Sequence, residues 1–450
     1  MRTAHRSLAR ALALVLALGL ALIALHAPTR RAVAQETQAS APPVGEALVP
    51  ADIPLAPIAP APIVWPLDES GHPIFGIDQT IEDPSGTSLH AFHVALARAA
   101  SGQGQARIVF YGASHVAADI YTSTIRHLLQ SRFGDAGHGF VLPIEPWPRY
   151  RAADLDVTSN YRHWDILRVH VGQTEPQLYG VMGVTFTTEE RAWGRIDTEE
   201  QRASRFELWY AERPDGGTID VLVDGHLDRR LNTRSDHPQS EYAVITTEDR
   251  PHTFEIRARG DGTITVYGAT VERERPGVVV DTMGINGARA AAQLLWNPEL
   301  QAEQLRRRMP DLVVLAYGTN ESGDDDQPIA EYEAAARAVL ARVQAAVPGA
   351  SCLLVGPSDR PLVHRDGIAE PRVRTAEVID AQRRVAHDYG CGFFDLVAFG
   401  GGPMHMLEWA AADPPWAQSD HVHYTARGYT RLGEVLANAL VAGYSGPSAL

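Results

Sequence analysis

The sequence predicts an α/β protein, a parallel sheet in three α/β/α layers, interrupted by an inserted all-β sandwich domain. Short apolar runs typical of buried strands alternate with helical patterns in two separate stretches of the chain. Between them, residues 160–276 show period-two alternation and turn signals instead. Alternating strands and helices imply a parallel sheet covered on both faces, with right-handed crossovers.

Strands of the parallel sheet are expected where short apolar runs end at a turn. The first run, Arg107–Tyr111, ends at Gly112, and a helical pattern follows at 120–133, with Gly134 suited to its C-terminal end. Further strands are expected at Val278–Asp281, Leu312–Tyr317, Cys352–Val355 and Phe393–Leu396. The accompanying helices are expected at 289–308, 329–346, 375–389 and 426–441.

The stretch 160–276 reads as a β-sandwich because short alternating runs are separated by glycine-rich turns. The runs lie at 206–210, 218–221, 254–257 and 263–266, with turns at 214–217, 224–225 and 260–262. The α/β domain is therefore expected in two parts, 69–159 and 277–450, on either side of this insert.

The first 68 residues are expected to lie outside both domains. Three arginines precede the apolar run Ala11–Leu25, and Ala32-Val33-Ala34 has the A-x-A cleavage pattern, so residues 1–34 read as a secretory signal peptide. An uncleaved N-terminal anchor is the alternative. Residues 35–68 are rich in Pro and Ala and are expected to form a semi-rigid linker. A periplasmic or secreted location follows, with no membrane span after cleavage.

Charge and composition exclude several classes of function. The 450 residues carry a net charge of −15, which argues against nucleic acid as a partner. All 40 basic residues are arginine, so no lysine-based mechanism is available. The two cysteines, Cys352 and Cys391, are too few for a disulfide framework or a cysteine-rich metal site, and they are either buried thiols or bonded to each other.

Two short motifs carry groups suited to nucleophilic catalysis. Ser114, in Gly112-Ala113-Ser114-His115, follows the first strand at the start of a helix, where an N–H is free to hold an oxyanion. Taken alone, the motif fits a helix N-cap better. Asp420 and His423 occur in D-H-V-H, where a carboxylate can orient an imidazole that accepts a hydroxyl proton. A metal site at Asp420, His421 and His423 is the minor alternative.

Two further motifs could supply oxyanion-hole donors. Asn320, in Tyr317-Gly318-Thr319-Asn320-Glu321, follows the strand at 312–317 and carries an NH₂ donor. Gly287, in Gly284-Ile285-Asn286-Gly287, would let a backbone N–H approach a substrate oxygen closely. Each motif alone is also an ordinary turn.

In the order Ser, Gly, Asn and Asp-x-x-His, the four motifs resemble the blocks of the SGNH (GDSL-like) hydrolase family. The likeness covers residues of about 105–140 and 278–442, and the block D-x-x-H-x-T-x-x-G-Y is its most specific part. Ala113 stands where the family has the Asp of its G-D-S motif. The resemblance implies a flavodoxin-like sheet and an acyl-enzyme mechanism without metal or organic cofactor.

The resemblance also assigns roles to single residues. It implies that Ser114 is the nucleophile, His423 the general base and Asp420 the residue that orients His423. The Ser114 N–H, the Gly287 N–H and the Asn320 side chain would form the oxyanion hole. His115 and His421 receive no catalytic role, and His115 is expected to be structural.

The position of the insert resembles that in periplasmic peptidoglycan O-acetylesterases, which carry a carbohydrate-binding-like sandwich there. The resemblance implies an acetylated glycan substrate, with peptidoglycan favoured. Trp193, Trp209 and Tyr210 could stack on sugar rings, although Trp209 lies in an alternating run typical of a sandwich core. The alternatives are a polysaccharide O-acetyltransferase with the same triad and a non-catalytic glycan-binding envelope protein. The oligomeric state is not readable from the sequence.

Overall fold

The computed structural model describes residues 63–169 and 177–447. The expected signal peptide (1–34) lies outside the described residues, as does the expected linker up to residue 62. The described end of the linker segment is packed: the Trp65 ring contacts Phe75 and Trp409 edge-on, and its indole N–H donates to Glu408 at 2.9 Å.

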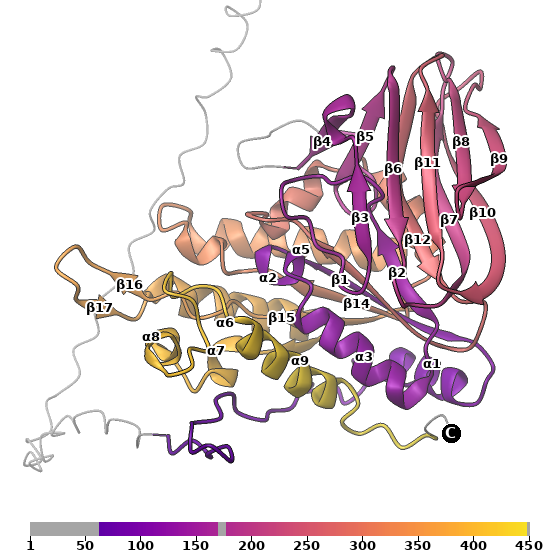
Figure 1. Ribbon diagram of the computed structural model, residues 1–450. Helices are drawn as coiled ribbons and strands as arrows, with labels where there is room; N and C mark the ends of the chain where they lie inside the picture. Colours follow the sequence, from indigo (N-terminus) through magenta and orange to yellow (C-terminus); the bar gives the residue numbers. More distant parts are fainter. Residues whose placement is uncertain (1–62, 170–176, 448–450) are drawn as a thin grey trace, which may run out of the picture. The chain divides into compact units, whose positions relative to one another are not determined.

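Five parallel strands form the sheet of the α/β part (Figure 1). They are β1 (Gln105–Gly112), β13 (Gly277–Gly284), β14 (Leu312–Ala316), β15 (Ser351–Val355) and β18 (Gly392–Phe394). Their spatial order is β13-β1-β14-β15-β18, the doubly wound order 2-1-3-4-5. Every neighbouring pair is parallel, so the predicted three-layer, flavodoxin-like α/β fold is confirmed.

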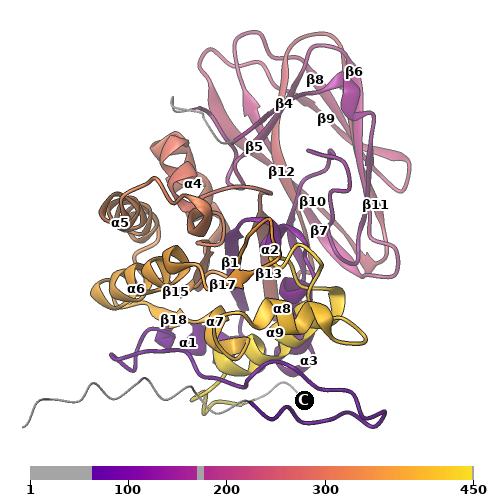
Figure 2. The same ribbon diagram turned by 90° about the vertical axis from the view of Figure 1, so that its left-hand side faces the viewer.

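Helices cover both faces of this sheet (Figure 2). One face carries α1 (His90–Ala100), α3 (Tyr121–Phe133) and α9 (Ala426–Leu440), and the other carries α4 (Pro298–Arg308), α5 (Ile329–Ala346) and α6 (Val373–Asp388). Alternate side chains of β1 explain the two layers: Ile108 and Phe110 pack on the first face, and Val109 and Tyr111 on the second.

Shorter elements complete the α/β part. They are the helices α2 (Ser114–Ala117), α7 (Leu396–Phe399) and α8 (His405–Ala411), the 3₁₀ turns η2 (Ala290–Leu295) and η3 (Glu321–Gly323), and the strand pair β16 (Leu362–Val363) and β17 (Ala369–Glu370).

The prediction of one continuous helix at 289–308 was wrong. The segment forms η2, leaves helical geometry at Trp296 and Asn297, and re-enters it as α4. Asn297 caps α4, since its Oδ1 accepts the Leu300 N–H at 2.8 Å, and Pro298 occupies the first helical position. The predicted strand 393–396 is likewise shorter, because Asp395 caps α7.

The antiparallel strands form two sheets packed face to face (Figure 1). One contains, in spatial order, β10 (Gln239–Arg250), β7 (Ala203–Glu212), β12 (Ile264–Glu272), β5 (Val184–Thr188) and β4 (Asp165–Arg168), and β2 (Gly137–Val141) also pairs with β12. The other contains β3 (Asp156–Ser159), β6 (Arg191–Asp197), β11 (Thr253–Arg259), β8 (Thr218–Val223) and β9 (His226–Asn232). The turn η1 (Tyr161–His163) joins β3 to β4.

The sandwich and the α/β part share one continuous apolar core. Phe206 and Phe254 stack between the two antiparallel sheets, with ring centroids 4.9 Å apart. The same cluster extends to Tyr111 on β1, whose ring contacts Trp296 edge-on. Such a core fixes the insert against the parallel sheet rather than leaving it on a flexible tether.

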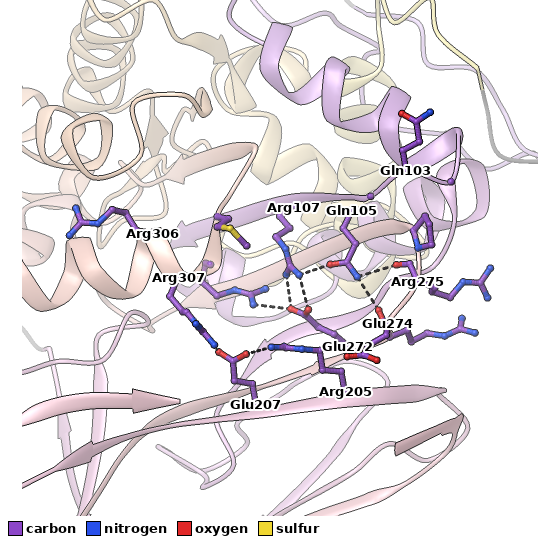
Figure 3. Close-up of a pocket in the computed structure, with 16 residues that line it drawn as sticks. Gln103, Gln105, Arg107, Arg205, Glu207, Glu272, Glu274, Arg275, Arg306 and Arg307 are labelled. Carbon is purple, nitrogen blue, oxygen red and sulfur yellow. Dashed lines mark hydrogen bonds and ion pairs between the residues drawn. The ribbon is translucent and has the colours of Figure 1, made fainter. Parts of the chain in front are cut away.

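Arginine–carboxylate pairs also cross this junction (Figure 3). Glu272, at the end of β12, is buried and bonds both Arg107 on β1 and Arg308 on α4, at 2.6 and 2.8 Å. Arg307 reaches Glu207 on β7 at 2.9 Å. These residues line a pocket of about 770 Å³ where β1 begins, at the sheet edge opposite the carboxyl ends of the parallel strands. Because all of its arginines except Arg275 and Arg306 are paired with carboxylates, we interpret the pocket as part of the structural contact between the sandwich and the α/β part.

The two cysteines are bonded to each other. Cys352 lies on β15 and Cys391 directly precedes β18, and the bond closes a loop with a sequence separation of 39 residues. The possibility of two free buried thiols is thereby excluded. None of the helices in the described ranges combines the length and the apolarity needed to span a bilayer.

Candidate active site

Three loops converge at the carboxyl edge of the parallel sheet. Gly112 at the end of β1 lies opposite Gly284 on β13 and Ala316 on β14, so the segments that follow leave the sheet side by side. Gly112 permits this approach, because a Cβ there would lie 2.2 Å from the Val116 side chain and 2.7 Å from the Ala316 carbonyl oxygen. In open α/β sheets, ligands bind at this edge.

Ser114, His423 and Asp420 form a continuous hydrogen-bonded chain at this edge. Ser114 is the first residue of α2, and its Oγ lies 2.8 Å from Nε2 of His423. Nδ1 of His423 lies 2.7 Å from Oδ2 of Asp420. The loop from α8 to α9 brings both residues to the serine. The nucleophile–base–orienting-group arrangement is the one that acyl transfer requires.

The other oxygen of Asp420 fixes the loop itself. Oδ1 accepts the N–H groups of Val422 and His423 at 2.9 and 3.0 Å. Partial burial acts to raise the pKa of the Asp420 carboxyl, but these hydrogen bonds and the bond to the His423 ring hold it below its usual value. The carboxylate is therefore ionised at neutral pH and keeps the proton of the imidazole on Nδ1.

Gly287 and Asn320 lie on the two neighbouring loops. Gly287 has φ of +76° and an exposed backbone, so its N–H is accessible in a conformation that favours glycine. Asn320 is half-buried, and one N–H of its amide donates to the Ala288 carbonyl at 2.9 Å. Its second N–H is left to act as a donor. Ser114 N–H belongs to the first turn of α2, where backbone N–H groups have no helical partner.

Glu321, which the sequence reasoning left without a role, ties these two loops together. It is buried, and its carboxylate accepts the Ala290 N–H at 2.8 Å and the Gly318 N–H at 3.0 Å. Burial raises the pKa of the Glu321 carboxyl despite these bonds. The position of Glu321 after a predicted strand was visible in the sequence, but no sequence pattern indicated that its side chain would join two loops.

The structure does not assemble the alternative metal site. His421 adopts φ of +55°, and Asp420 directs its two carboxylate oxygens to the Val422 N–H and to the His423 ring instead. Across residues 63–169 and 177–447, no group of three or more His, Cys, Asp or Glu side chains is placed to hold a metal ion.

The aromatic residues of the insert separate into core and surface. Trp209 is fully buried, in line with its alternating run, and Tyr210 is also buried. Trp193 is half-buried and points outward from β6, where it lines a pocket of about 290 Å³ with Arg191, Asp220 and Arg257 among others. Of the three candidates, Trp193 alone presents its ring to this pocket.

Comparison with known families finds one similarity, in the second half of the chain. Residues 246–431 match the model of the GDSL-like Lipase/Acylhydrolase family. This part of the chain is therefore similar to that family. The matched range contains Gly287, Asn320, Asp420 and His423, whereas Ser114 precedes it. No curated protein matches the chain.

One solved structure supports the fold of the α/β part and its insert. A structure described as a peptidoglycan O-acetylesterase in action aligns over 81% of this chain and 99% of its own, with a TM-score of 0.68 and 24% identity. A salicylyl-acyltransferase from a tetracycline biosynthetic pathway (SsfX3) covers 66% of this chain and 99% of its own, with a TM-score of 0.29 and 14% identity. A family two carbohydrate esterase from Cellvibrio japonicus covers 64% and 98%, with a TM-score of 0.28 and 12% identity.

Proposed function

We propose that the protein is an exported serine esterase that removes O-acetyl groups from a cell-envelope glycan, with peptidoglycan as the favoured substrate. The observation that carries this proposal is the chain from Ser114 through His423 to Asp420, with distances of 2.8 and 2.7 Å. The similarity to an acylhydrolase family supports the reaction class. The peptidoglycan O-acetylesterase of similar fold supports the choice of glycan.

The reaction follows from the positions of the groups. As Ser114 Oγ attacks the acetyl carbonyl, its proton passes to His423 Nε2, and the carbonyl oxygen becomes an oxyanion. The Ser114 N–H, the Gly287 N–H and the free N–H of Asn320 are the proposed donors to that oxyanion. Each donor of this kind is typically worth about 10²–10³ in rate.

Collapse of the tetrahedral adduct completes the acylation half of the reaction. The bond from the acetyl carbon to the sugar oxygen breaks, and His423 returns its proton to that oxygen. Water then attacks the acetyl-Ser114 ester while His423 takes a water proton, and the proton goes back to Ser114 Oγ as acetate leaves. Asp420 holds His423 in one tautomer throughout. No step calls on a metal ion or an organic cofactor.

Two observations bear on location and substrate size. The bond between Cys352 and Cys391 supports an oxidising compartment outside the cytoplasm, in agreement with the signal peptide expected at 1–34. On the insert, the half-buried Trp193 lines one pocket with Arg191 and Arg257, of which Arg257 is paired with Glu255. An aromatic ring with flanking arginines suits a sugar ring that bears a carboxylate. We propose this surface as the place where the insert holds the polymer.

The test is acetate release from O-acetylated peptidoglycan, compared with acetylated xylan and with a series of p-nitrophenyl esters. The proposal predicts the fastest turnover on peptidoglycan and on the acetyl member of the series. Acetate release that rises only when a second glycan is added, with the acetyl group recovered on that glycan, would favour an O-acetyltransferase. If none of these esters is hydrolysed, the alternative of a non-catalytic glycan-binding protein would be favoured.

A further inference from the structure

A buried serine outside the four motifs joins three of the loops that carry the proposed catalytic groups. Ser358 follows β15 at the carboxyl edge of the sheet and is fully buried. It bonds to the sequence neighbour of each of three proposed catalytic residues: His115 beside Ser114, Thr319 beside Asn320, and Val422 beside His423. The three bonds place one hydroxyl group at the meeting point of the loops.

The contacts form a closed network of neutral groups. Ser358 Oγ lies 3.0 Å from Nε2 of His115, 3.3 Å from the hydroxyl of Thr319 and 3.3 Å from the carbonyl oxygen of Val422. The Ser358 N–H donates to the Thr319 hydroxyl at 3.1 Å. Nδ1 of His115 lies 2.7 Å from the hydroxyl of Tyr429 on α9. All five residues except Val422 are buried.

When His115 is neutral, only one arrangement of protons satisfies every contact. The Val422 carbonyl can only accept, so Ser358 donates to it and must accept from His115. His115 therefore carries its proton on Nε2, and Nδ1 accepts the proton of the Tyr429 hydroxyl. Thr319 accepts the Ser358 N–H and donates its own proton to Ser358 Oγ. No donor or acceptor in the network is then left without a partner.

The surroundings of His115 keep its imidazole neutral. Burial, together with the nearby ring of His423, lowers the pKa of His115 to about 3. The two imidazole rings have centroids 5.3 Å apart. A cation at this distance would oppose the positive charge that His423 acquires when it takes the proton of Ser114.

We propose that Ser358 is a positioning residue for the acyl transfer: its side chain sets the separation of the Ser114, Asn320 and His423 loops through a neutral hydrogen-bonded network. The inference rests on the proposed function, because those three residues have catalytic roles only there. Displacements of about 1 Å at a reacting group can cost about 10²-fold in rate, so small loop movements matter.

The first test compares Ser358→Ala with Ser351→Ala. Ser351 is a buried serine at the other end of β15, and its Oγ accepts the Phe92 N–H at 3.2 Å, far along the strand from the loops. Both changes remove one buried hydroxyl group. Ser358→Ala should lower kcat on p-nitrophenyl acetate by about 10- to 100-fold with KM within about threefold, whereas Ser351→Ala should leave both within about twofold. Equal kcat for two variants of equal Tm would overturn the proposal.

A second pair of variants, at Thr319, keeps the proposal testable if Ser358→Ala fails to fold. Thr319→Val is nearly isosteric and removes the hydroxyl group, while Thr319→Ser retains it. The valine variant should lose kcat, by roughly 3- to 30-fold, and the serine variant should recover most of it. If valine and serine give the same kcat, the network does not position the loops.

A spectroscopic measurement separates this inference from the proposed function. In ¹⁵N-histidine NMR of the wild-type protein, His115 should remain a single neutral tautomer with its proton on Nε2 from pH 5 to 8, and Ser358→Ala should mix the tautomers. Titration of His115 in that range would overturn the network whether or not the protein is an esterase. If Ser114→Ala remains active while His115 behaves as expected, the proposed function fails and the network stands.

Discussion

Replacement of Asp359 by Asn should stabilise the protein more at pH 8 than at pH 5. Asp359 directly follows Ser358 and is only 2% exposed. Its carboxylate accepts the Met406 N–H at 3.4 Å and lies 3.8 Å from Nδ1 of His405. Burial raises the pKa of the Asp359 carboxyl to about 6, and hydrogen bonds from backbone N–H groups offset this only in part. Burial also lowers the pKa of His405 to about 4, so no cation compensates the carboxylate near neutrality.

The sign and size follow from proton linkage. Because the folded-state pKa of Asp359 lies above the value of 3.8 expected in the unfolded chain, the folded protein binds more protons near pH 5, and stability falls as the pH rises through 6. The resulting cost is roughly 3 kcal/mol at pH 8 and about half of that at pH 5. Asp359→Asn removes this pH-dependent cost, whatever constant cost its buried amide adds.

The assay is urea unfolding followed by tryptophan fluorescence at pH 5 and pH 8. The difference in unfolding free energy between Asp359→Asn and wild type should grow by about 1.4 kcal/mol between the two pH values. Asp366→Asn, an exposed position in the segment between β16 and β17, controls for the loss of one unit of charge. A difference that stays within about 0.5 kcal/mol across the range would refute the reasoning.

Four further predictions concern the candidate active site, the insert, the buried ion pairs of Glu272 and the disulfide bond. Asp420→Asn should lower kcat by roughly 10²–10⁴-fold with a small change in KM, because it leaves the base in the wrong tautomer; steady-state kinetics checks this. Trp193→Ala should leave kcat/KM for p-nitrophenyl acetate within about twofold and lower the rate on polymeric peptidoglycan about tenfold. Equal effects on both substrates would contradict a glycan-binding role for the surface around Trp193. Glu272→Gln should cost about 3 kcal/mol of unfolding free energy, since Arg107 loses its carboxylate partner while Arg308 keeps Asp281; an unchanged urea midpoint would contradict this. Replacing both Cys352 and Cys391 by Ser should cost roughly 4 kcal/mol by the loop-entropy relation, measured in the same way.

The parallel sheet could be predicted from the sequence because each of its strands is buried on both faces. Runs such as Leu312–Ala316 are apolar at almost every position, and the turns that follow them are rich in glycine. The edge strand β9 (His226–Asn232) carried no such signal, since nearly all of its side chains are exposed and charged or polar. The break before α4 was readable from Asn297-Pro298, an N-cap followed by a proline in the first turn.

The proposed catalytic residues could be found because they lie in short motifs of fixed order, and this order can be seen in the sequence alone. The residues that hold them in place could not. Ser358 and Glu321 act through contacts with loops far away in sequence, and a lone polar residue after a strand has no periodicity to mark it. The ion pairs of Glu272 with two distant arginines are equally invisible before the sheets are assembled.

We propose Ser114 as the nucleophile of an acyl-enzyme reaction. The most direct measurement is to treat the protein with a fluorophosphonate and to map the labelled peptide by mass spectrometry. We expect a single stoichiometric label on Ser114, lost in Ser114→Ala and strongly slowed in a His423→Ala variant, because the hydroxyl group 2.8 Å from His423 Nε2 is the activated one. No label on the folded protein, or a label on another serine that persists in Ser114→Ala, would contradict it.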